Sequence, residues 1–249
     1  MTIPLTLITG GSRGIGAATA RRLAQAGHDI AINYRHDEAA AQAVAAEVRA
    51  LGRRALCLQA DIADADQVGR MFEAIDQGLG TVTGLVNNAG IVAPAARFLD
   101  TTPERWQRLF DVNVQGLLLC THAAARRMST RLGGAGGCIV NLSSRASEYG
   151  SPNVYVDYAA SKGAVDVLTR GLGRELISEG IRINGVRPGI IDTEIHADSH
   201  TADLLPQRTR DIPIGRMGRA EEIAEAIAWL LSDAASYTVG TMLDVSGGR

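Results

Sequence analysis

Short apolar runs alternate with alanine-rich segments along the whole chain, and this alternation constrains the fold more than any other feature. A short apolar run suits a strand that is buried on both faces, whereas apolar residues at helical spacing suit a helix that covers such strands. Strands joined by helical crossovers run parallel and pack between two layers of helices. We therefore predict an α/β fold built on a doubly wound parallel sheet of seven strands, with helices on both faces.

The boundaries of these elements follow from the same pattern. The expected strands are Leu5–Thr9, Asp29–Asn33, Ala55–Ala60, Gly84–Asn87, Cys138–Leu142, Arg182–Arg187 and Met242–Val245. The expected helices are Gly14–Ala26, Glu38–Leu51, Ala65–Leu79, Pro103–Thr130 with a break, Val156–Ser178 and Ala220–Leu231. No Pro- or Ser-rich linker divides the chain, so residues 1–249 are expected to form one domain. The segment 192–218 holds two prolines and little apolar rhythm, which predicts a lid over a site.

Composition narrows the classes of function. A net charge of −2 and a pI near 6.2 give no electrostatic footprint for nucleic acid or an anionic membrane. No apolar run approaches the roughly 18 residues that a membrane span needs, and no basic segment followed by an apolar stretch suggests a secretory signal. Cys57, Cys120 and Cys138 lack the spacing of metal ligands and suit the core of a protein in a reducing compartment. We expect a cytoplasmic protein without a metal site.

A glycine-rich turn follows the first expected strand. Thr9–Gly16 reads TGGSRGIG and leads into an alanine-rich helix, so glycines meet the start of a helix. Backbone amides of such a turn can approach a pyrophosphate closely, and the helix N-terminus carries partial positive charge. No Gly-Lys-Ser/Thr follows, which excludes the ATP-type loop, and the spacing differs from G-x-G-x-x-G. The turn predicts a dinucleotide-binding, Rossmann-like fold.

The end of the second strand indicates which dinucleotide binds. Enzymes that use NAD usually place an acid there to bind the ribose 2′-hydroxyl, but this strand ends Asn33-Tyr34-Arg35, and Asp37 lies past it. Arginine can hold a 2′-phosphate through two N–H groups, and Arg13 could reach the same phosphate from the glycine-rich turn. The sequence favours NADP(H), with NAD(H) as the alternative.

Tyr158 and Lys162 lie four residues apart in a segment of helical pattern. Residues at this spacing share one face of a helix, so the phenol and the ammonium would point the same way. A fixed ammonium favours the phenolate, and we expect it to lower the tyrosine pKa so that Tyr158 can exchange protons near neutral pH. Spacing alone also fits an ordinary helix surface.

Seven motifs in order resolve that ambiguity. They are TGGSRGIG at Thr9–Gly16, ADI at Ala60–Ile62, NNAG at Asn87–Gly90, VNV at Val112–Val114, NLSS at Asn141–Ser144, YAASK at Tyr158–Lys162 and RPGIIDT at Arg187–Thr193. With them the chain resembles the short-chain dehydrogenase/reductase family, in its usual form of about 250 residues, nearly end to end. Its ending, DVSGGR, is similar to the family's VDGG tail, with Ser246 in place of the common acid.

The resemblance implies a catalytic set of Asn113, Ser144, Tyr158 and Lys162. Tyr158 would exchange a proton with the substrate oxygen, and Ser144 would hydrogen-bond that oxygen. Lys162 would bind the nicotinamide ribose, and Asn113 would hold a water behind Lys162. Ser143 is the alternative to Ser144, because side chains of neighbouring strand residues point to opposite faces.

The resemblance also implies how the adenosine half of the cofactor is bound. Asp61 and Ile62 would bracket the adenine, with the carboxylate accepting from its amino group. Asn87, Ala89 and Gly90 would pass close to the ribose and hold neighbouring strands together.

The nicotinamide half would lie against Pro188, Gly189, Ile191 and Thr193, with Thr193 bonded to the carboxamide. The full set of expected cofactor contacts is Gly10, Ser12, Arg13, Gly14, Ile15, Gly16, Tyr34, Arg35, Asp61, Ile62, Asn87, Ala89, Gly90, Tyr158, Lys162, Pro188, Gly189, Ile191 and Thr193.

The expected activity is hydride transfer between NADP(H) and a carbonyl or secondary alcohol. Polar residues lie in the expected loop 145–157 and in the lid: Arg145, Glu148, Tyr149, Asn153, Tyr155 and His196. They favour a small polar substrate such as a sugar or hydroxyketone. The other interpretation is that these side chains merely contact solvent. The alternative is a 3-oxoacyl-[acyl-carrier-protein] reductase, whose acidic partner would need a basic patch; Arg126, Arg127 and Arg131 on one helix are the candidates. A protein that only senses the dinucleotide is a remote alternative, because Tyr158 and Lys162 are both present.

Small residues on the helix 156–178, among them Ala159, Ala160, Gly163 and Ala164, permit close packing against a second copy. The resemblance implies a homotetramer assembled through this helix, the helix before it and the C-terminal strand.

Overall fold

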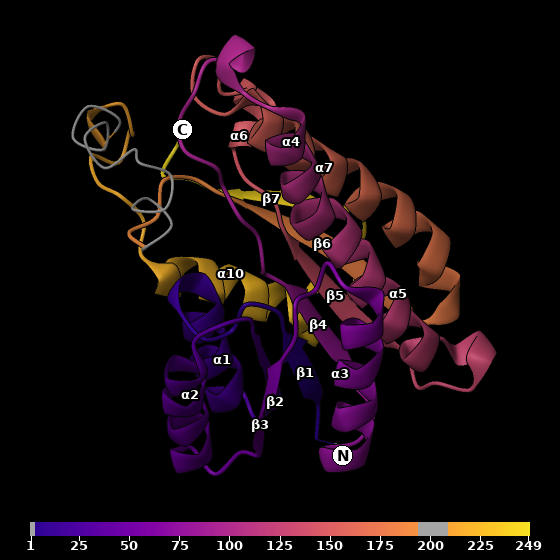
Figure 1. Ribbon diagram of the computed structural model, residues 1–249. Helices are drawn as coiled ribbons and strands as arrows, with labels where there is room; N and C mark the ends of the chain where they lie inside the picture. The colour runs from indigo at the N-terminus through magenta and orange to yellow at the C-terminus, as the bar shows by residue number, and fades with distance from the viewer. Residues whose placement is uncertain (1–2, 194–208) are drawn as a thin grey trace.

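The computed structural model describes residues 3–193 and 209–249. Seven parallel strands form one sheet in the order β3-β2-β1-β4-β5-β6-β7 (Figure 1). The strands are β1 Leu5–Ile8, β2 Asp29–Tyr34, β3 Ala55–Gln59, β4 Gly84–Asn87, β5 Gly137–Leu142, β6 Ile181–Pro188 and β7 Met242–Val245. The predicted Rossmann-like sheet is confirmed, with strand ends shifted by one residue at most.

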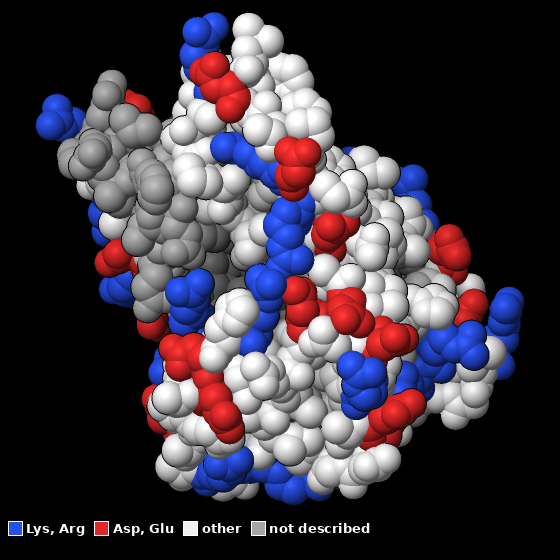
Figure 2. All heavy atoms as spheres, viewed as in Figure 1, with Lys and Arg blue, Asp and Glu red and all other residues white. Residues whose placement is uncertain are grey.

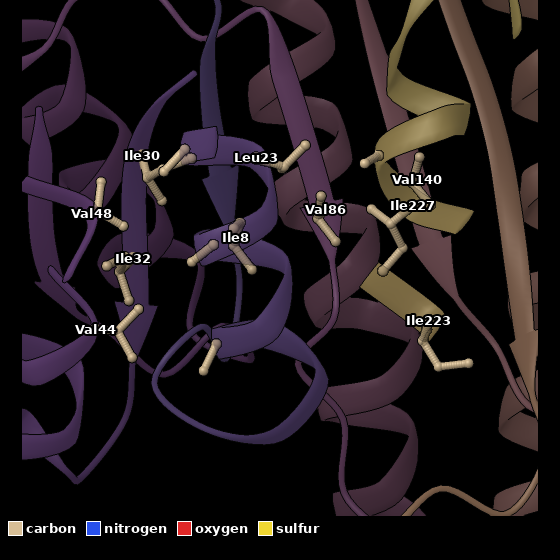
Figure 3. Packing of buried hydrophobic residues seen from close by; sticks show 14 of the residues in the cluster. Ile8, Leu23, Ile30, Ile32, Val44, Val48, Val86, Val140, Ile223 and Ile227 are labelled. Atoms are coloured by element: carbon tan, nitrogen blue, oxygen red, sulfur yellow. The ribbon is translucent and has the colours of Figure 1, made fainter. Parts of the chain in front are cut away.

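Helices cover both faces of the sheet. They are α1 Gly14–Gln25, α2 Glu38–Ala50, α3 Ala65–Gly78, α4 Pro103–Phe110, α5 Leu117–Met128, α6 Ala146–Tyr149, α7 Val156–Leu176 and α10 Ala220–Leu231. One hydrophobic cluster joins the sheet to α1, α2 and α10, and a second joins it to α3 and α5, with apolar residues of α7 packed against it. Figure 3 shows the first cluster, in which Ile223 and Ile227 of α10 lie near Val86 and Val140 of the central strands.

The strand order turns around between β1 and β4. The chain moves outward from β1 to β3 on one side, then continues from β4 to β7 on the other. In open sheets of this kind, ligands bind outside the carboxyl ends of the strands at such a switch point. The glycine-rich turn that follows β1 lies there.

Two local features differ from the sequence pattern. The long helix expected from Pro103 is α4 and α5 joined by a π-helical turn, Asp111–Gly116, instead of a simple break. The segment 145–157, expected as a loop, holds the one-turn helix α6. Gly116 ends the π-helical turn and Gly150 caps α6, but these glycines alone do not predict either element, because tertiary contacts hold both.

The segment expected as a lid is anchored at both ends. Ile191 forms a parallel bridge with Gly218, and the amide of Asp192 donates to the carbonyl of Gly218 at 2.9 Å. Residues 194–208 of this segment, with His196, lie outside the described part of the chain.

Candidate active site

Thr9 and Asn88 hold the glycine-rich turn to the end of β4. The Thr9 hydroxyl accepts from the amides of Asn88 and Ala89, both at 3.0 Å. The Asn88 side chain donates to the carbonyls of Thr9 and Gly10, both at 2.9 Å. The resemblance assigned no role to the Asn88 side chain, although its place in NNAG was noted. These bonds fix the turn before any ligand binds.

A second asparagine holds the turn from the other side. The Asn33 side chain accepts from the amide of Gly10 at 3.2 Å and donates to the carbonyls of Leu58 and Ala60. Asn33 thereby joins the glycine-rich turn to β3, although the sequence showed it only as the end of a strand. The available signal was an asparagine at the end of an apolar strand, since an amide that is buried there needs hydrogen-bond partners.

The start of α1 suits an anion. Gly10 and Gly14 adopt φ of +60° and +51°, conformations that favour glycine. A Cβ on Gly16 would lie 2.3 Å from the carbonyl oxygen of Gly10, so helix and turn touch there. No side chain caps α1 and no acid lies in its first turn, which leaves its amides and partial positive charge to a bound phosphate. The turn therefore fits the pyrophosphate of a dinucleotide.

The end of β2 joins two of the expected adenosine contacts. Arg35 is half-exposed, and its Nε lies 3.1 Å from Oδ2 of Asp61, which Nη2 of Arg108 also approaches at 3.1 Å. Burial acts to raise the pKa of Asp61, but the Ala63 amide and the two arginines outweigh it and hold the pKa below its usual value. Asp37 caps α2 by accepting from the amide of Ala40. The end of β2 is thus followed by the cation of Arg35, and the nearest acid in sequence, Asp37, is engaged in capping α2.

Three expected adenosine contacts face inward. The side chains of Tyr34 and Ile62 lie in the two hydrophobic clusters. Asn87 is buried and donates 2.9 Å bonds to Thr121 of α5 and Asn141 of β5, so it ties neighbouring strands together. A cofactor contact from these three residues would have to come from their backbone.

Gly90 lies between two of the expected catalytic residues. A Cβ at Gly90 would be 3.3 Å from Oδ1 of Asn113 and 3.3 Å from Nζ of Lys162. The stretch from Asn87 to Gly90 therefore runs from the sheet core to the catalytic set.

The two neighbouring serines point in different directions. Ser143 is buried, and its hydroxyl donates to the carbonyl of Lys162 at 3.1 Å. Ser144 is partly exposed, accepts from the amide of Ala146 at 3.1 Å, and hydrogen-bonds toward the Tyr158 phenol. Of the two, Ser144 is therefore the serine beside Tyr158.

Tyr158 and Lys162 lie together on α7. The ammonium of Lys162 is 5.8 Å from the Tyr158 ring centroid and donates to the carbonyl of Leu142 at 2.8 Å. The edge of Tyr155 packs against the Tyr158 ring at a centroid distance of 5.4 Å. The pair thus lies over the end of β5, next to Ser144.

The pKa expectation for this pair needs correction. Burial raises the pKa of Tyr158 to about 12, although the bond from Ser144 opposes it, and burial lowers the pKa of Lys162 to about 8. Removing both groups from water disfavours both charged forms, and this desolvation outweighs the Ser144 bond to Tyr158 and the Asp166 charge near Lys162. In the protein alone the ammonium therefore does not bring the phenol into the neutral range.

Asn113 lies in the π-helical turn and is buried. Its Oδ1 accepts from the amide of Ile91 at 2.8 Å, and its Nδ2 donates to the carbonyl of Ile91 at 2.9 Å and to Ser161 at 3.0 Å. The amide side chain therefore uses three of its four hydrogen-bonding positions within the protein.

The stretch expected at the nicotinamide meets the glycine-rich turn. A Cβ at Gly14 would lie 3.4 Å from Cγ2 of Thr193. Gly189 donates to the carbonyl of Val245 at 3.0 Å and passes so close to Ser246 that a Cβ would lie 2.8 Å from its Cα. The ends of β6 and β7 thus border the same region as α1.

Several residues expected to line a polar substrate pocket have other partners. Arg145 contacts Asp244 at 2.6 Å, Glu148 contacts Arg187 at 2.7 Å, and the Tyr149 ring lies against Arg145 and Arg249. Arg145 and Glu148 thus form ion pairs with β7 and β6, and Tyr149 packs against two arginines, so these residues do not form a free polar lining. Tyr155 remains beside Tyr158.

Comparisons with known proteins agree with this geometry. The profile of a family described as enoyl-(acyl carrier protein) reductase matches residues 10–249. A solved structure of a short-chain type dehydrogenase/reductase from Mycobacterium marinum superposes with a TM-score of 0.92 at 38% identity, covering 98% of this chain and 94% of that one. The chain belongs to the short-chain dehydrogenase/reductase family. It is accordingly an NAD(P)-dependent enzyme that acts on CH–OH and C=O groups.

Three further known proteins are similar to this chain over almost their full length. The oxidoreductase YgfF of Escherichia coli K12, named as uncharacterised, is 50% identical, with 98% of this chain and 99% of that protein covered. The 3-oxoacyl-[acyl-carrier-protein] reductase FabG of Staphylococcus aureus Mu50 is 37% identical, covering 97% and 96%. A metagenomic blue fluorescent protein solved in complex with NADPH has a TM-score of 0.90 at 36% identity, covering 98% and 97%.

The short-chain dehydrogenase/reductase fold here has no helix, within residues 3–193 and 209–249, that is long and apolar enough to cross a membrane. The same residues contain no cluster of His, Cys, Asp and Glu that could hold a metal ion.

Proposed function

We propose that this enzyme transfers a hydride reversibly between NADP(H) and a small polar carbonyl or secondary alcohol. The observation that carries the proposal is the convergence of Ser144, Tyr158 and Lys162 at the end of β5, beside the anion-binding start of α1. Residues 1–249 would act as one dinucleotide-binding and catalytic domain, with 192–218 as its lid. A reducing, cytoplasmic location agrees with the free thiols of Cys57, Cys120 and Cys138.

The bound nicotinamide would supply or accept the hydride, and every other task would fall to side chains. Ser144 would hold the substrate oxygen while Tyr158 passes a proton to it or takes one from it. Lys162 would hold the nicotinamide ribose and favour the phenolate as that proton leaves. Asn113 would hold a water behind Lys162, using its backbone or the one hydrogen-bonding position that its amide side chain retains.

The preference for NADP(H) is supported by the residues around the expected ribose site. Arg35 is half-exposed and pairs with Asp61, which Arg108 also contacts. Asp61 would therefore still be paired with Arg108 if Arg35 turned to a 2′-phosphate. Asp37, the nearest acid, is engaged in capping α2. The structural relative that binds NADPH supports the same choice.

The cofactor test compares kcat/KM for NADPH and NADH in the wild type and in Arg13→Ala and Arg35→Ala. We expect NADPH to be preferred, and each variant to lose about tenfold for NADPH while NADH changes by less than about twofold, as a lost phosphate contact predicts. Arg22→Ala is the matched control, because Arg22 lies on the outer surface of α1 and pairs with Glu225. A wild type that prefers NADH would overturn the NADP assignment.

The second candidate is a 3-oxoacyl-[acyl-carrier-protein] reductase, which the likeness to FabG favours. Its acidic partner would need a basic surface, but Arg127 pairs with Asp76 at 2.7 Å, and Arg131 lies in a 3₁₀ turn after α5 with Glu179 at 3.9 Å. Arg126, Arg127 and Arg131 thus do not share one helix as expected. Figure 2 shows, on the face in view, a narrow central band of basic atoms with acidic atoms beside it and no broad basic patch.

A panel of carbonyls followed by NADPH absorbance separates the two candidates. It contains hydroxyketones, keto sugars and an acetoacetyl thioester of acyl carrier protein. The main proposal predicts the highest kcat/KM on a small polar ketone, and the highest value on the thioester would establish the second candidate.

We also propose a homotetramer. On α5 and α7 the side chains of Leu118 and Val167 are 39% and 62% exposed, and Gly163 has open space beside it. An apolar, small-residue surface of this kind suits a helix–helix contact with a second copy. Light scattering after gel filtration at micromolar concentration should give four times the chain mass, and a monomer would contradict it.

A further inference from the structure

Arg187 lies at the centre of a charged cluster behind the catalytic set, and no step of the proposed reaction uses it. It is on β6 and only 9% exposed. Its Nε and Nη2 contact Oδ2 of Asp166 at 3.0 and 2.9 Å, and its Nη1 contacts Oε1 of Glu148 at 2.7 Å. The same Nη1 lies 3.4 Å from Asp244 of β7. One guanidinium therefore joins four elements of the fold.

Asp166 connects this cluster to the catalytic face of α7. It is buried and follows Lys162 by four residues, which is one helical turn. Its Oδ2 contacts Arg187, and its Oδ1 has no hydrogen-bond partner among the described residues. A buried carboxylate is costly unless it is paired, so the position of this turn of α7 depends on Arg187.

Glu148 connects the cluster to the segment that carries Ser144. It follows Ser144 by four residues and lies on α6, a single helical turn without a side-chain cap. So short a helix is unstable by itself and needs tertiary contacts. Figure 1 shows α6 beside the start of α7. Glu148 is thus the ion-pair link from α6 to β6 on this side.

Arg145 holds the other side of the same segment. It contacts Asp244 at 2.6 Å and donates to the backbone carbonyl of Arg249 at 2.8 Å, and its amide donates to the carbonyl of Pro188 at 3.0 Å. The start of α6 is therefore fixed to the ends of β6 and β7. Arg145 also lies 3.7 Å from Glu148, whereas Arg187 contacts this carboxylate at 2.7 Å and is its link to β6.

We propose that Arg187 is a positioning residue, which bridges Asp166 and Glu148 and so holds the segment carrying Ser144 against the helix carrying Tyr158 and Lys162. The inference rests on the proposed roles of those three residues. Two hydroxyls that must meet one substrate oxygen need a fixed separation, and a misplacement of about 1 Å can cost about 100-fold in rate. A planar guanidinium can bridge two carboxylates, which a lysine, as a point charge, does less well.

The charged groups around Asp166 also affect the pKa of Lys162. Asp166 contacts Arg187 of β6, and the same guanidinium contacts Glu148 of α6 and Asp244 of β7. Lys162 lies one turn before Asp166 on α7. The negative charge of Asp166 acts to raise the pKa of Lys162 against the effect of burial. Within the cluster it is Asp166 that favours the ammonium form of Lys162, and Arg187 holds Asp166 in place.

The test uses the full-length enzyme and four variants: Arg187→Met, Arg187→Lys, Glu148→Gln and, as a matched control, Glu225→Gln. Glu148 is 42% exposed, so its variant should fold even if Arg187→Met does not. Glu225 forms an exposed ion pair with Arg22 on a distant helix. Two quantities are measured: kcat with NADPH and a carbonyl that the wild type reduces, and hydrogen exchange of the backbone amides of residues 144–150.

We expect Arg187→Met to lower kcat about 30-fold or more, with NADPH dissociation changed less than about threefold. Arg187→Lys should recover part of the rate, Glu148→Gln should lose about threefold to tenfold, and Glu225→Gln should match the wild type. Exchange at 144–150 should quicken about tenfold in Arg187→Met and Glu148→Gln, because α6 loses an anchor.

Wild-type kcat in folded Arg187→Met or in Glu148→Gln would overturn the inference, as would unchanged exchange in both. Hydrogen exchange is measured without turnover, so it tests whether Arg187 anchors α6 independently of the reaction. Tyr158→Phe belongs in the same assay: if it retains turnover, the proposed function fails, whereas its exchange at 144–150 should stay as in the wild type.

Discussion

The side chain of Asn113 donates to the hydroxyl of Ser161 at 3.0 Å, and that hydroxyl donates to the carbonyl of Tyr158 at 2.7 Å. Ser161 precedes Lys162, so the π-helical turn is bonded to the same turn of α7 that carries both groups of the pair. Asn113, Ser161 and Lys162 are all buried. The irregular turn in one helix thus fixes the chemically important turn of another.

Tyr158→Phe tests the proton-transfer role directly. We expect kcat to fall at least about 1,000-fold, because the ring keeps its packing against Tyr155 but has no proton to exchange. Binding of NADPH, followed by fluorescence titration, should change less than about threefold, since no phosphate contact is lost. Substantial remaining turnover would refute the role of Tyr158.

Lys162 offers an unusually direct pKa measurement, because it is the only lysine in the sequence. Burial lowers its pKa from 10.5 to about 8, so its ammonium is lost as the pH rises through about 8. Competitive acylation read by mass spectrometry on the peptide containing residue 162 should give this midpoint. Asp166→Asn removes a charge that supports the ammonium, so its midpoint should be lower; a midpoint near 10.5 in the wild type would contradict the burial argument.

The same lysine separates loss of activity from loss of structure. Between pH 8 and 10.5 the unfolded chain binds a proton that the folded chain does not, so this group makes stability rise with pH in that window. Activity that needs the ammonium should fall over the same window. We therefore expect kcat/KM to decline above about pH 8, whereas the deprotonation of Lys162 should not lower the free energy of unfolding measured in urea over that window.

Gly16 and Gly69 provide a matched pair of glycine substitutions. Gly16→Ala places a methyl group 2.3 Å from the Gly10 carbonyl, so we expect NADPH affinity to fall at least about tenfold. Gly69 lies within α3 with open space beside it, so Gly69→Ala should stabilise the protein by about 0.5–1 kcal/mol. Calorimetry and NADPH titration of both variants check this, and an unchanged affinity in Gly16→Ala would contradict the close contact.

Asp29 should contribute strongly to stability. It is 1% exposed and bonds Arg53 and Arg54, each at 2.6 Å. Burial acts to raise its pKa, but the bonds from Arg54 and Arg53 hold that pKa below its usual 3.8, so the contribution is present above about pH 3.8 and is lost as the pH falls further. Asp29→Asn should cost about 2 kcal/mol in urea unfolding at pH 7, and a cost below about 0.5 kcal/mol would contradict this.

Much of the fold was predictable because its signals are local. Each strand is an apolar run of a few residues bounded by turn residues, and the glycine-rich turn marks where the first helix begins. The π-helical turn was not predictable, because DVNVQG continues the helical pattern and its glycine, Gly116, does not end the helix. The short α6 was also missed, since tertiary contacts hold a helix of that length.

The candidate site was predictable where residues form motifs, and less so where partners are distant in sequence. Ser144, Tyr158 and Lys162 lie together as their motifs suggested. Arg145 and Glu148 were expected at a substrate pocket but pair with Asp244 and Arg187, whose nearness only the folded sheet creates. In the protein without cofactor the pKa of Tyr158 is raised instead of lowered, because spacing reveals a neighbouring charge but not the loss of water around the phenol.

The asparagines that hold the glycine-rich turn have a consequence for the thermodynamics of cofactor binding. Asn33 and Asn88 fix the turn from β2 and β4, so its amides are already aligned when a dinucleotide arrives. Binding then requires little loss of conformational entropy in the protein. Residues that lie beneath the ligand, and not only those that contact it, would therefore raise its affinity. Side chains in the interior, as much as those on the surface, would set how tightly the nucleotide is held.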